Sequence, residues 1–145
     1  MSNLINPHVH ELSVNRGDEL VVVSLRLTTA GQITLKKRWN ENTISTLFGA
    51  IDDVERFADV LTQALNYPGN QNVIKKGDEL ADLLADNDLL GIANKQKLMS
   101  AIGRASGILS EQEKEKMDRN ADKMMDGLSE DEDNKGNGEK PQPNQ

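Results

Sequence analysis

Alternating apolar and polar residues near the start of the chain predict extended structure. An apolar-rich run over residues 9–14 leads into the sequence NRGD at 15–18, whose residues favour turns. Residues 20–27 (LVVVSLRL) are rich in β-branched side chains, and their later apolar positions alternate with polar ones. These two runs and the turn between them predict a β-hairpin over about residues 9–27.

From Thr29 onward the next segment fits two structures. Alternation of apolar and polar residues over 33–36 would continue the sheet as a third strand. Thr29 and Gln32 have the spacing of a helix capping box, and Leu35 and Trp39 lie four residues apart, as on one side of a helix. The sequence leaves both a strand and a helix open for this segment.

Helical spacing of apolar residues begins near Thr43. Apolar residues repeat at intervals of three and four from 44 to 51, which predicts an amphipathic helix. Asp52 or Asp53 can cap a second helix, in which the apolar residues of 54–65 form one stripe. We therefore expect two helices in close succession here.

The rest of the chain predicts further helices. Leucines at 80–84 and apolar residues over 90–102 indicate two short ones. Ser110 and Glu113 form a second capping box, which predicts the start of a strongly charged last helix. The apolar positions of that helix are Met117, Ala121, Met124, Met125 and Leu128. The predicted fold is mainly α (α+β in class), a small bundle of short helices with an N-terminal β-hairpin.

Charge divides the chain into two parts. Residues 1–110 hold 13 acidic and 11 basic residues, whereas residues 111–145 hold 11 acidic and 6 basic ones. The segment 129–145 (SEDEDNKGNGEKPQPNQ) contains no apolar residue and cannot bury enough surface to offset the entropy of ordering it. We expect a single domain over 1–128, with the hairpin followed by helices over about 29–128, and a disordered acidic tail over 129–145.

Composition excludes several classes of protein. The 145 residues carry a net charge of −7 and include no cysteine, which excludes disulfides, thiolate zinc sites and cysteine nucleophiles. The longest uncharged apolar run, 20–25, is far shorter than the roughly 20 residues that span a bilayer, and no signal peptide is expected. The acidic balance argues against duplex DNA as the main partner. These features predict a cytoplasmic protein that does not bind membranes.

Residues suited to catalysis or metal binding do not assemble into a recognisable site. His8 and His10 could share a metal from one face of a strand, but no third ligand cluster lies nearby in the sequence. Three acidic pairs stand at predicted helix starts or loops, where a carboxylate complements the helix dipole, so we interpret them as caps. They are Asp52 with Asp53, Asp78 with Glu79, and Asp86 with Asp88. We expect no enzyme activity, no metal site and no cofactor.

The sequence contains one basic cluster, which lies beside an aromatic residue: Lys36, Lys37, Arg38 and Trp39. Basic groups next to a stacking ring are typical of proteins that bind single-stranded nucleic acid. The same residues also fit a helix that packs its tryptophan inward and turns its basic side chains to water, which is the interpretation we favour.

A longer stretch, LRLTTAGQITLKKRWNENTISTLFGAIDDVERFADVLTQAL, resembles the tail assembly chaperones of long, flexible-tailed bacteriophages, particularly those of Gram-positive hosts. The resemblance covers about residues 25–66 in recognisable positions and about 9–128 in layout. The positions that carry it are Leu25, Leu27, Thr28, Thr29, Leu35, Lys36, Lys37, Leu47, Phe48, Ile51, Asp52, Asp53, Ala64 and Leu65.

The resemblance implies a non-enzymatic protein that binds and solubilises the phage tape measure protein before the tail tube polymerises. It implies action in the cytoplasm of the host bacterium and absence from the mature virion. The tail tube protein and further copies of the chain are additional partners that it suggests. We expect the tape measure contact on one of two apolar faces, which comprise Leu47, Phe48, Phe57 and Leu61, or Met117, Met124 and Met125.

An alternative from another class is a phage-type single-stranded DNA-binding protein with an acidic tail that recruits partners. It requires residues 29–38 to form a strand of a small antiparallel sheet. Its contacts with DNA would come from the basic cluster and Trp39.

Overall fold

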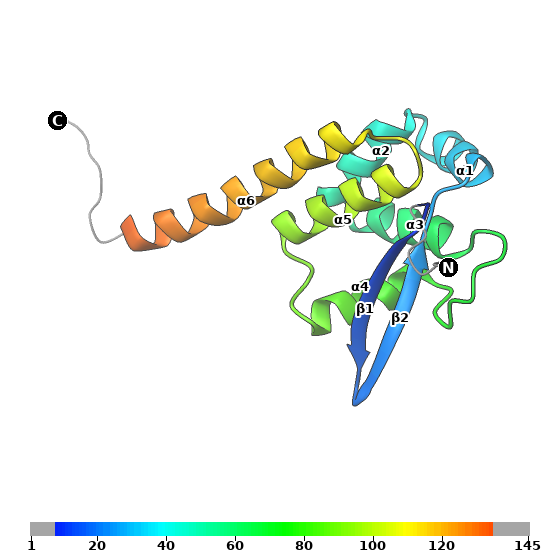
Figure 1. Cartoon of the computed structure of the whole chain (residues 1–145), viewed down its shortest axis with the longest axis horizontal. Helices are drawn as coiled ribbons and strands as arrows, with labels where there is room; N and C mark the ends of the chain where they lie inside the picture. The colour runs from blue at the N-terminus through cyan, green and yellow to red at the C-terminus, as the bar shows by residue number, and fades with distance from the viewer. Residues whose placement is uncertain (1–7, 135–145) are drawn as a thin grey trace.

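The computed structural model describes residues 8–134, and side chains as far as residue 124 within the last helix (Figure 1). A two-stranded antiparallel hairpin packs against a group of helices. The elements in chain order are β1 (His10–Arg16), β2 (Glu19–Leu25), α1 (Thr29–Trp39), α2 (Thr43–Gly49), the 3-10 turn η1 (Ala50–Asp52), α3 (Val54–Leu65), α4 (Gly77–Asp86), α5 (Ile92–Ala105) and α6 (Glu111–Asn134). The predicted fold class, mainly helical with an N-terminal hairpin, is confirmed.

The hairpin forms where the alternation predicts it. Arg16 pairs with Glu19 across a two-residue turn that begins at Gly17, whose φ of +63° suits a glycine. Val14, Val23 and Leu25 are among the side chains that the sheet turns toward the helices, and all three are buried. The buried face of the hairpin therefore forms one wall of the core.

Residues 29–39 form a helix, which resolves the choice that the sequence left open. The predicted cap is displaced by one residue, because the side chain of Thr28 rather than Thr29 accepts a hydrogen bond from the Gly31 N–H. Gln32 donates its side-chain amide to the Leu27 carbonyl instead of completing a capping box. The single-stranded DNA alternative assumed a strand here, and that assumption is wrong.

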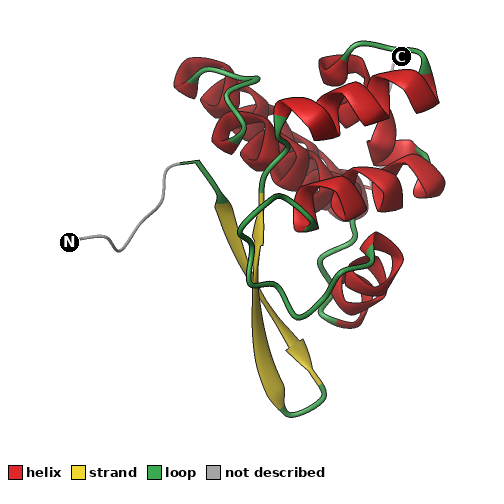
Figure 2. Ribbon diagram, turned by 90° about the vertical axis from the view of Figure 1, so that its right-hand side faces the viewer, coloured by secondary structure: helices red, strands yellow, loops and turns green. Residues whose placement is uncertain are grey.

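Helix α3 is the central element of the packing, and Figure 2 shows the helices grouped together with the hairpin extending from them. Asp53 caps it by accepting from the N–H groups of Glu55 and Arg56, as one of the two predicted capping residues. α3 contacts the hairpin, α1, α2 and α4. Gly77, the first residue of α4, lies against the backbone of α3 so closely that a Cβ atom would stand 1.9 Å from the Ala58 carbonyl oxygen. Only glycine permits this approach.

The last helix begins where the sequence predicts it. The Ser110 Oγ accepts from the Glu113 N–H, and the Glu113 carboxylate accepts from the Ser110 N–H, so the capping box is formed in both directions. α6 continues to Asn134, so it extends into the first residues of the segment 129–145. The expectation for 135–145 lies outside the described residues. Figure 1 shows α6 projecting beyond the body of the molecule.

Candidate functional site

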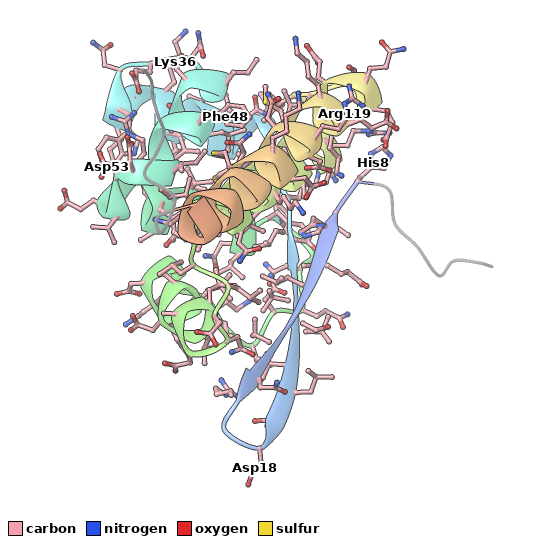
Figure 3. The ribbon with its side chains drawn as sticks, turned by 90° about the vertical axis from the view of Figure 1, so that its left-hand side faces the viewer. His8, Asp18, Lys36, Phe48, Asp53 and Arg119 are labelled. Carbon is pink, nitrogen blue, oxygen red and sulfur yellow. The ribbon has the colours of Figure 1, made fainter. Side chains whose placement is uncertain are left out.

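The first predicted protein-binding face is largely inside the core. Leu47 on α2 and Phe57 and Leu61 on α3 have at most 2% of their surface exposed. Phe48 is partly buried and packs against the same core; Figure 3 labels its position. The periodicity identified an apolar face correctly, but that face is covered by the protein's own helices, so a partner cannot reach three of these four residues in the folded structure.

The methionine stripe lies on α6 and is only partly covered. Met117 and Met124 are half-buried, and the side chain of Met125 lies outside the described part. Ala121 lies between them on the same side of the helix and is fully buried. The Met117 carbonyl accepts a hydrogen bond from the side chain of Gln96 on α5. This stripe therefore helps to dock α6 on α5.

The last two residues of the basic cluster, Arg38 and Trp39, are bound to α3. Trp39 donates its indole N–H to Asp59 at 2.7 Å, and Arg38 forms an ion pair with the same buried carboxylate at 2.5 Å. The guanidinium of Arg56 lies 4.9 Å from the centre of the Trp39 ring, so one face of the ring is occupied by a cation–π contact. Lys36 and Lys37 remain exposed in the last turn of α1, where they complement the helix dipole. The arrangement positions Trp39 for packing rather than for stacking on a base.

The histidines lie at the start of the hairpin, and only one of them faces the interior. His10 is partly buried beneath α6, and burial together with the Lys114 ammonium lowers its pKa from the usual 6.5. His8 is exposed, as Figure 3 shows. Among the residues whose side chains are described, 8–124, no three His, Cys, Asp or Glu side chains come together as metal ligands. None of the helices described is long and apolar enough to cross a membrane.

A groove lies where β1, α4, α5 and α6 meet. It holds a hollow of about 430 Å³, within the range of ligand pockets in proteins. Five apolar side chains line it, namely Leu12 from β1, Leu84 and Leu89 from the end of α4 and the loop after it, and Leu98 and Ala101 from α5. A second hollow of about 230 Å³ adjoins it toward the start of α6, and His10, Ala101 and Lys114 line both. We take this groove, defined by the two hollows, as the candidate functional site.

Polar groups close the α6 side of the groove. Lys114 and Asp118 form an ion pair at 2.6 Å, and Asp118 also accepts from the Ser100 hydroxyl. Lys97 pairs with Asp122 at 2.6 Å, and this hydrogen bond raises the pKa of Lys97. The carboxylate of Asp118 is thus fully engaged, whereas each ammonium still has N–H groups to offer. The groove presents apolar walls with donors along one rim.

Two asparagines whose role the sequence did not reveal bind backbone groups at the two edges of the hairpin. Asn87, after α4, donates to the Asn15 carbonyl and accepts from the Asn15 N–H, both at 3.0 Å. On the other edge, Asn72 makes the same pair of bonds to Ser24 at 2.7 Å. Each amide takes the place of one residue of a neighbouring strand. In the sequence both residues resemble ordinary loop asparagines, so no local signal distinguishes them.

Comparison of the chain with protein-family models, with curated proteins and with solved structures found no match. The function must therefore be argued from the groove and from the sequence pattern.

Proposed function

We propose that this protein is a non-enzymatic assembly chaperone that binds and solubilises the tape measure protein of a bacteriophage tail. It acts in the cytoplasm of the host bacterium and leaves before the mature virion forms. A tape measure chain is long and carries an apolar stripe, which would aggregate until the tail tube encloses it. The partner assignment comes from the sequence resemblance over residues 25–66.

The observation that carries the proposal is the groove beside α6. A binding protein for an apolar-striped chain needs an open apolar recess on an otherwise charged surface. Leucines line the recess, while the chain as a whole has a net charge of −7. Ion pairs and hydrogen bonds to α5 hold α6 over the rim beside a narrow apolar stripe in which, among the described side chains, only Ala121 is fully buried, so this wall can adjust to a partner at small cost in buried apolar surface.

The second predicted class, a single-stranded DNA-binding protein, has no comparable support. Residues 29–38, which that class requires as a strand, belong to helix α1, and one face of the Trp39 ring is occupied by the Arg56 guanidinium.

Co-expression tests the proposal. The chain is expressed with the tape measure protein encoded in the same genome, and we expect the tape measure protein to be soluble only when the chain is present. Leu89→Lys, which places a charge in the groove, should abolish this effect. Leu20→Lys is the matched control, because Leu20 is 63% exposed near the tip of the hairpin and remote from the groove.

A tape measure protein that stays soluble alone, or that never co-purifies with the chain, would refute the proposed function. So would recovery of replication proteins whose association with the chain is lost on nuclease treatment.

A further inference from the structure

The outer edge of β1 has unused backbone hydrogen-bonding groups beside the groove. Arg16 and Glu19 flank a two-residue turn, so they exchange both backbone bonds, and every second residue back along each strand does the same. The N–H and C=O of residues 11, 13 and 15 therefore point away from β2. Asn87 satisfies only Asn15. Among the hydrogen bonds of residues 8–134, none engages the backbone of Glu11 or Ser13 at this edge.

Next to these unused backbone groups, the inner face of β1 borders the groove. His10 and Leu12 alternate with Glu11 and Ser13, and their side chains line the hollows. A strand added to this edge would place alternate side chains on the inner face, next to His10 and Leu12. Figure 3 shows β1 running from His8, beside α6, to the tip at Asp18, with α4 across from it.

The two positions beside the added strand differ in chemistry. Around Leu12 the lining is apolar, with three further leucines and Ala101. Around His10 the lining is charged, because Arg104, Lys114 and Glu111 line the adjoining hollow. Glu111 already accepts from Arg104, and Asp118 accepts from Lys114. Asn94, which also lines the larger hollow, has a side-chain amide with no partner within the described part of the chain. This amide and the remaining N–H groups of Lys114 are the donors that complement a carboxylate here.

We propose that the groove binds an extended peptide segment as a third strand on β1, with an apolar side chain opposite Leu12 and an acidic side chain two residues away, opposite His10. Backbone bonds to Glu11 and Ser13 hold the segment, the 430 Å³ hollow takes the apolar side chain, and the rim of donors takes the carboxylate. This deepens the proposed function by naming how its site takes a polypeptide, and it rests on that binding role without requiring the tape measure protein as the source.

The probe is a fluorescein-labelled, acetylated peptide, TTLTETT, titrated into the full chain and followed by fluorescence anisotropy. We expect saturable binding, and protection from hydrogen exchange of the Glu11 and Ser13 amides in the complex. The peptide TTLTKTT, which reverses the charge, should bind at least about fivefold more weakly. This comparison leaves the protein unaltered, so it does not depend on the folding of any variant.

Ser13→Pro removes one edge donor without affecting the bonds to β2, since proline is tolerated at an open edge. We expect a loss of affinity of at least about fivefold, the effect of one missing hydrogen bond in a short interface. Val22→Pro is the matched control: Val22 lies opposite Ser13 in the register, is 51% exposed and faces the other edge. It should change the affinity by less than about twofold.

A second pair of variants tests the rim. Lys114→Glu should weaken TTLTETT and strengthen TTLTKTT, whereas Lys116→Glu, at an exposed position of the same helix that lines neither hollow, should do neither.

Several outcomes would overturn the proposal. One is that TTLTETT does not bind at millimolar protein, and another is that Ser13→Pro and Val22→Pro lose equal affinity for the peptide. The proposal also fails if the bound peptide has helical rather than extended carbon chemical shifts. It fails likewise if the chain forms a dimer that Ser13→Pro abolishes. If the peptide fails while co-expression still solubilises the tape measure protein, the strand-addition mode is wrong and the chaperone function stands. If the peptide binds but co-expression fails to solubilise the tape measure protein, the strand-addition mode stands and the chaperone function is wrong.

Discussion

Helices α3 and α6 are attached to the same domain by different forces. α3 buries Phe57, Val60, Leu61, Ala64 and Leu65, and it contacts the hairpin and three other helices. Along α6, as far as side chains are described, only Ala121 is fully buried, beside the half-buried Met117 and Met124, and ion pairs and hydrogen bonds add to its attachment to α5. One helix is fixed by extensive apolar burial, and the other by a narrow apolar stripe together with hydrogen bonds and ion pairs.

The difference predicts two levels of stability in one domain. Burial of large apolar side chains contributes roughly 1.5–3 kcal/mol each, so α3 should open only when the whole domain unfolds. Exposed ion pairs contribute about 0–1 kcal/mol each, and the side chains of the pairs Lys97–Asp122 and Arg104–Glu111, which join α6 to α5, are 39–61% exposed. We therefore expect α6 to open locally, and the groove that it borders to be adjustable.

Phe57→Ala tests the α3 half of this contrast. Removing a fully buried phenylalanine from the centre of the core should lower the free energy of unfolding by about 3–5 kcal/mol. Chemical denaturation followed by circular dichroism measures it. A loss below about 1 kcal/mol would mean that α3 is not the centre of the fold.

Asp59→Ala measures how much a polar contact of α3 contributes to the free energy of unfolding. Asp59 is the buried acceptor for Trp39 and Arg38, and its removal should cost about 1–3 kcal/mol, chiefly through the orphaned indole N–H. The Arg38 part of that cost is small, because this side chain is 55% exposed. Denaturation followed by Trp39 fluorescence gives the number. Asp59→Asn, which keeps an acceptor, should lose less; equal losses for both variants would show that charge, not the hydrogen bond, matters.

The sequence predicted the parts of the molecule that local rules govern. The hairpin follows from alternation and from Gly17, α3 from its apolar stripe and aspartate cap, and the start of α6 from the Ser110–Glu113 box. The sequence did not decide between a helix and a strand for α1, because only Leu35 and Gly31 of its residues are buried and its apolar stripe is weak.

The candidate site could not be predicted in the same way. Leu47, Phe57 and Leu61 have the pattern of an apolar face, but only tertiary packing decides whether such a face meets a partner or the protein itself. The groove joins β1, near the start of the described chain, to α4, α5 and α6, which begin only at Gly77. Asn87 acts on Asn15 across 72 residues, so no local rule reveals it.

Ala121→Glu tests the α6 half of the contrast. A charge at Ala121, the one fully buried position among the α6 side chains that are described, should displace the helix, because an unpaired buried carboxylate is costly. Native-state hydrogen exchange should show protection in α6 falling by at least about tenfold, while amides of α3 change little. Asn120→Glu, at the neighbouring exposed position, is the control and should leave both unchanged. Equal losses in α3 and α6 would mean that the two helices unfold together.

Acidification should act on the α6 side of the domain through His10. Burial and then the Lys114 ammonium lower the pKa of His10, so the folded state binds this proton less readily than the unfolded state does. As the pH falls below about 6.5, the unfolded state is protonated first, and stability is lost until the pH passes the lower, folded-state pKa. The nearby Glu11 carboxylate opposes the shift without cancelling it. Thermal melts at pH 7.5 and pH 5.5 should therefore show a smaller acid-induced loss for His10→Gln than for the parent chain. If His10→Gln keeps the full acid sensitivity, the proton acts elsewhere, and the attachment of α6 does not depend on the charge of the groove wall.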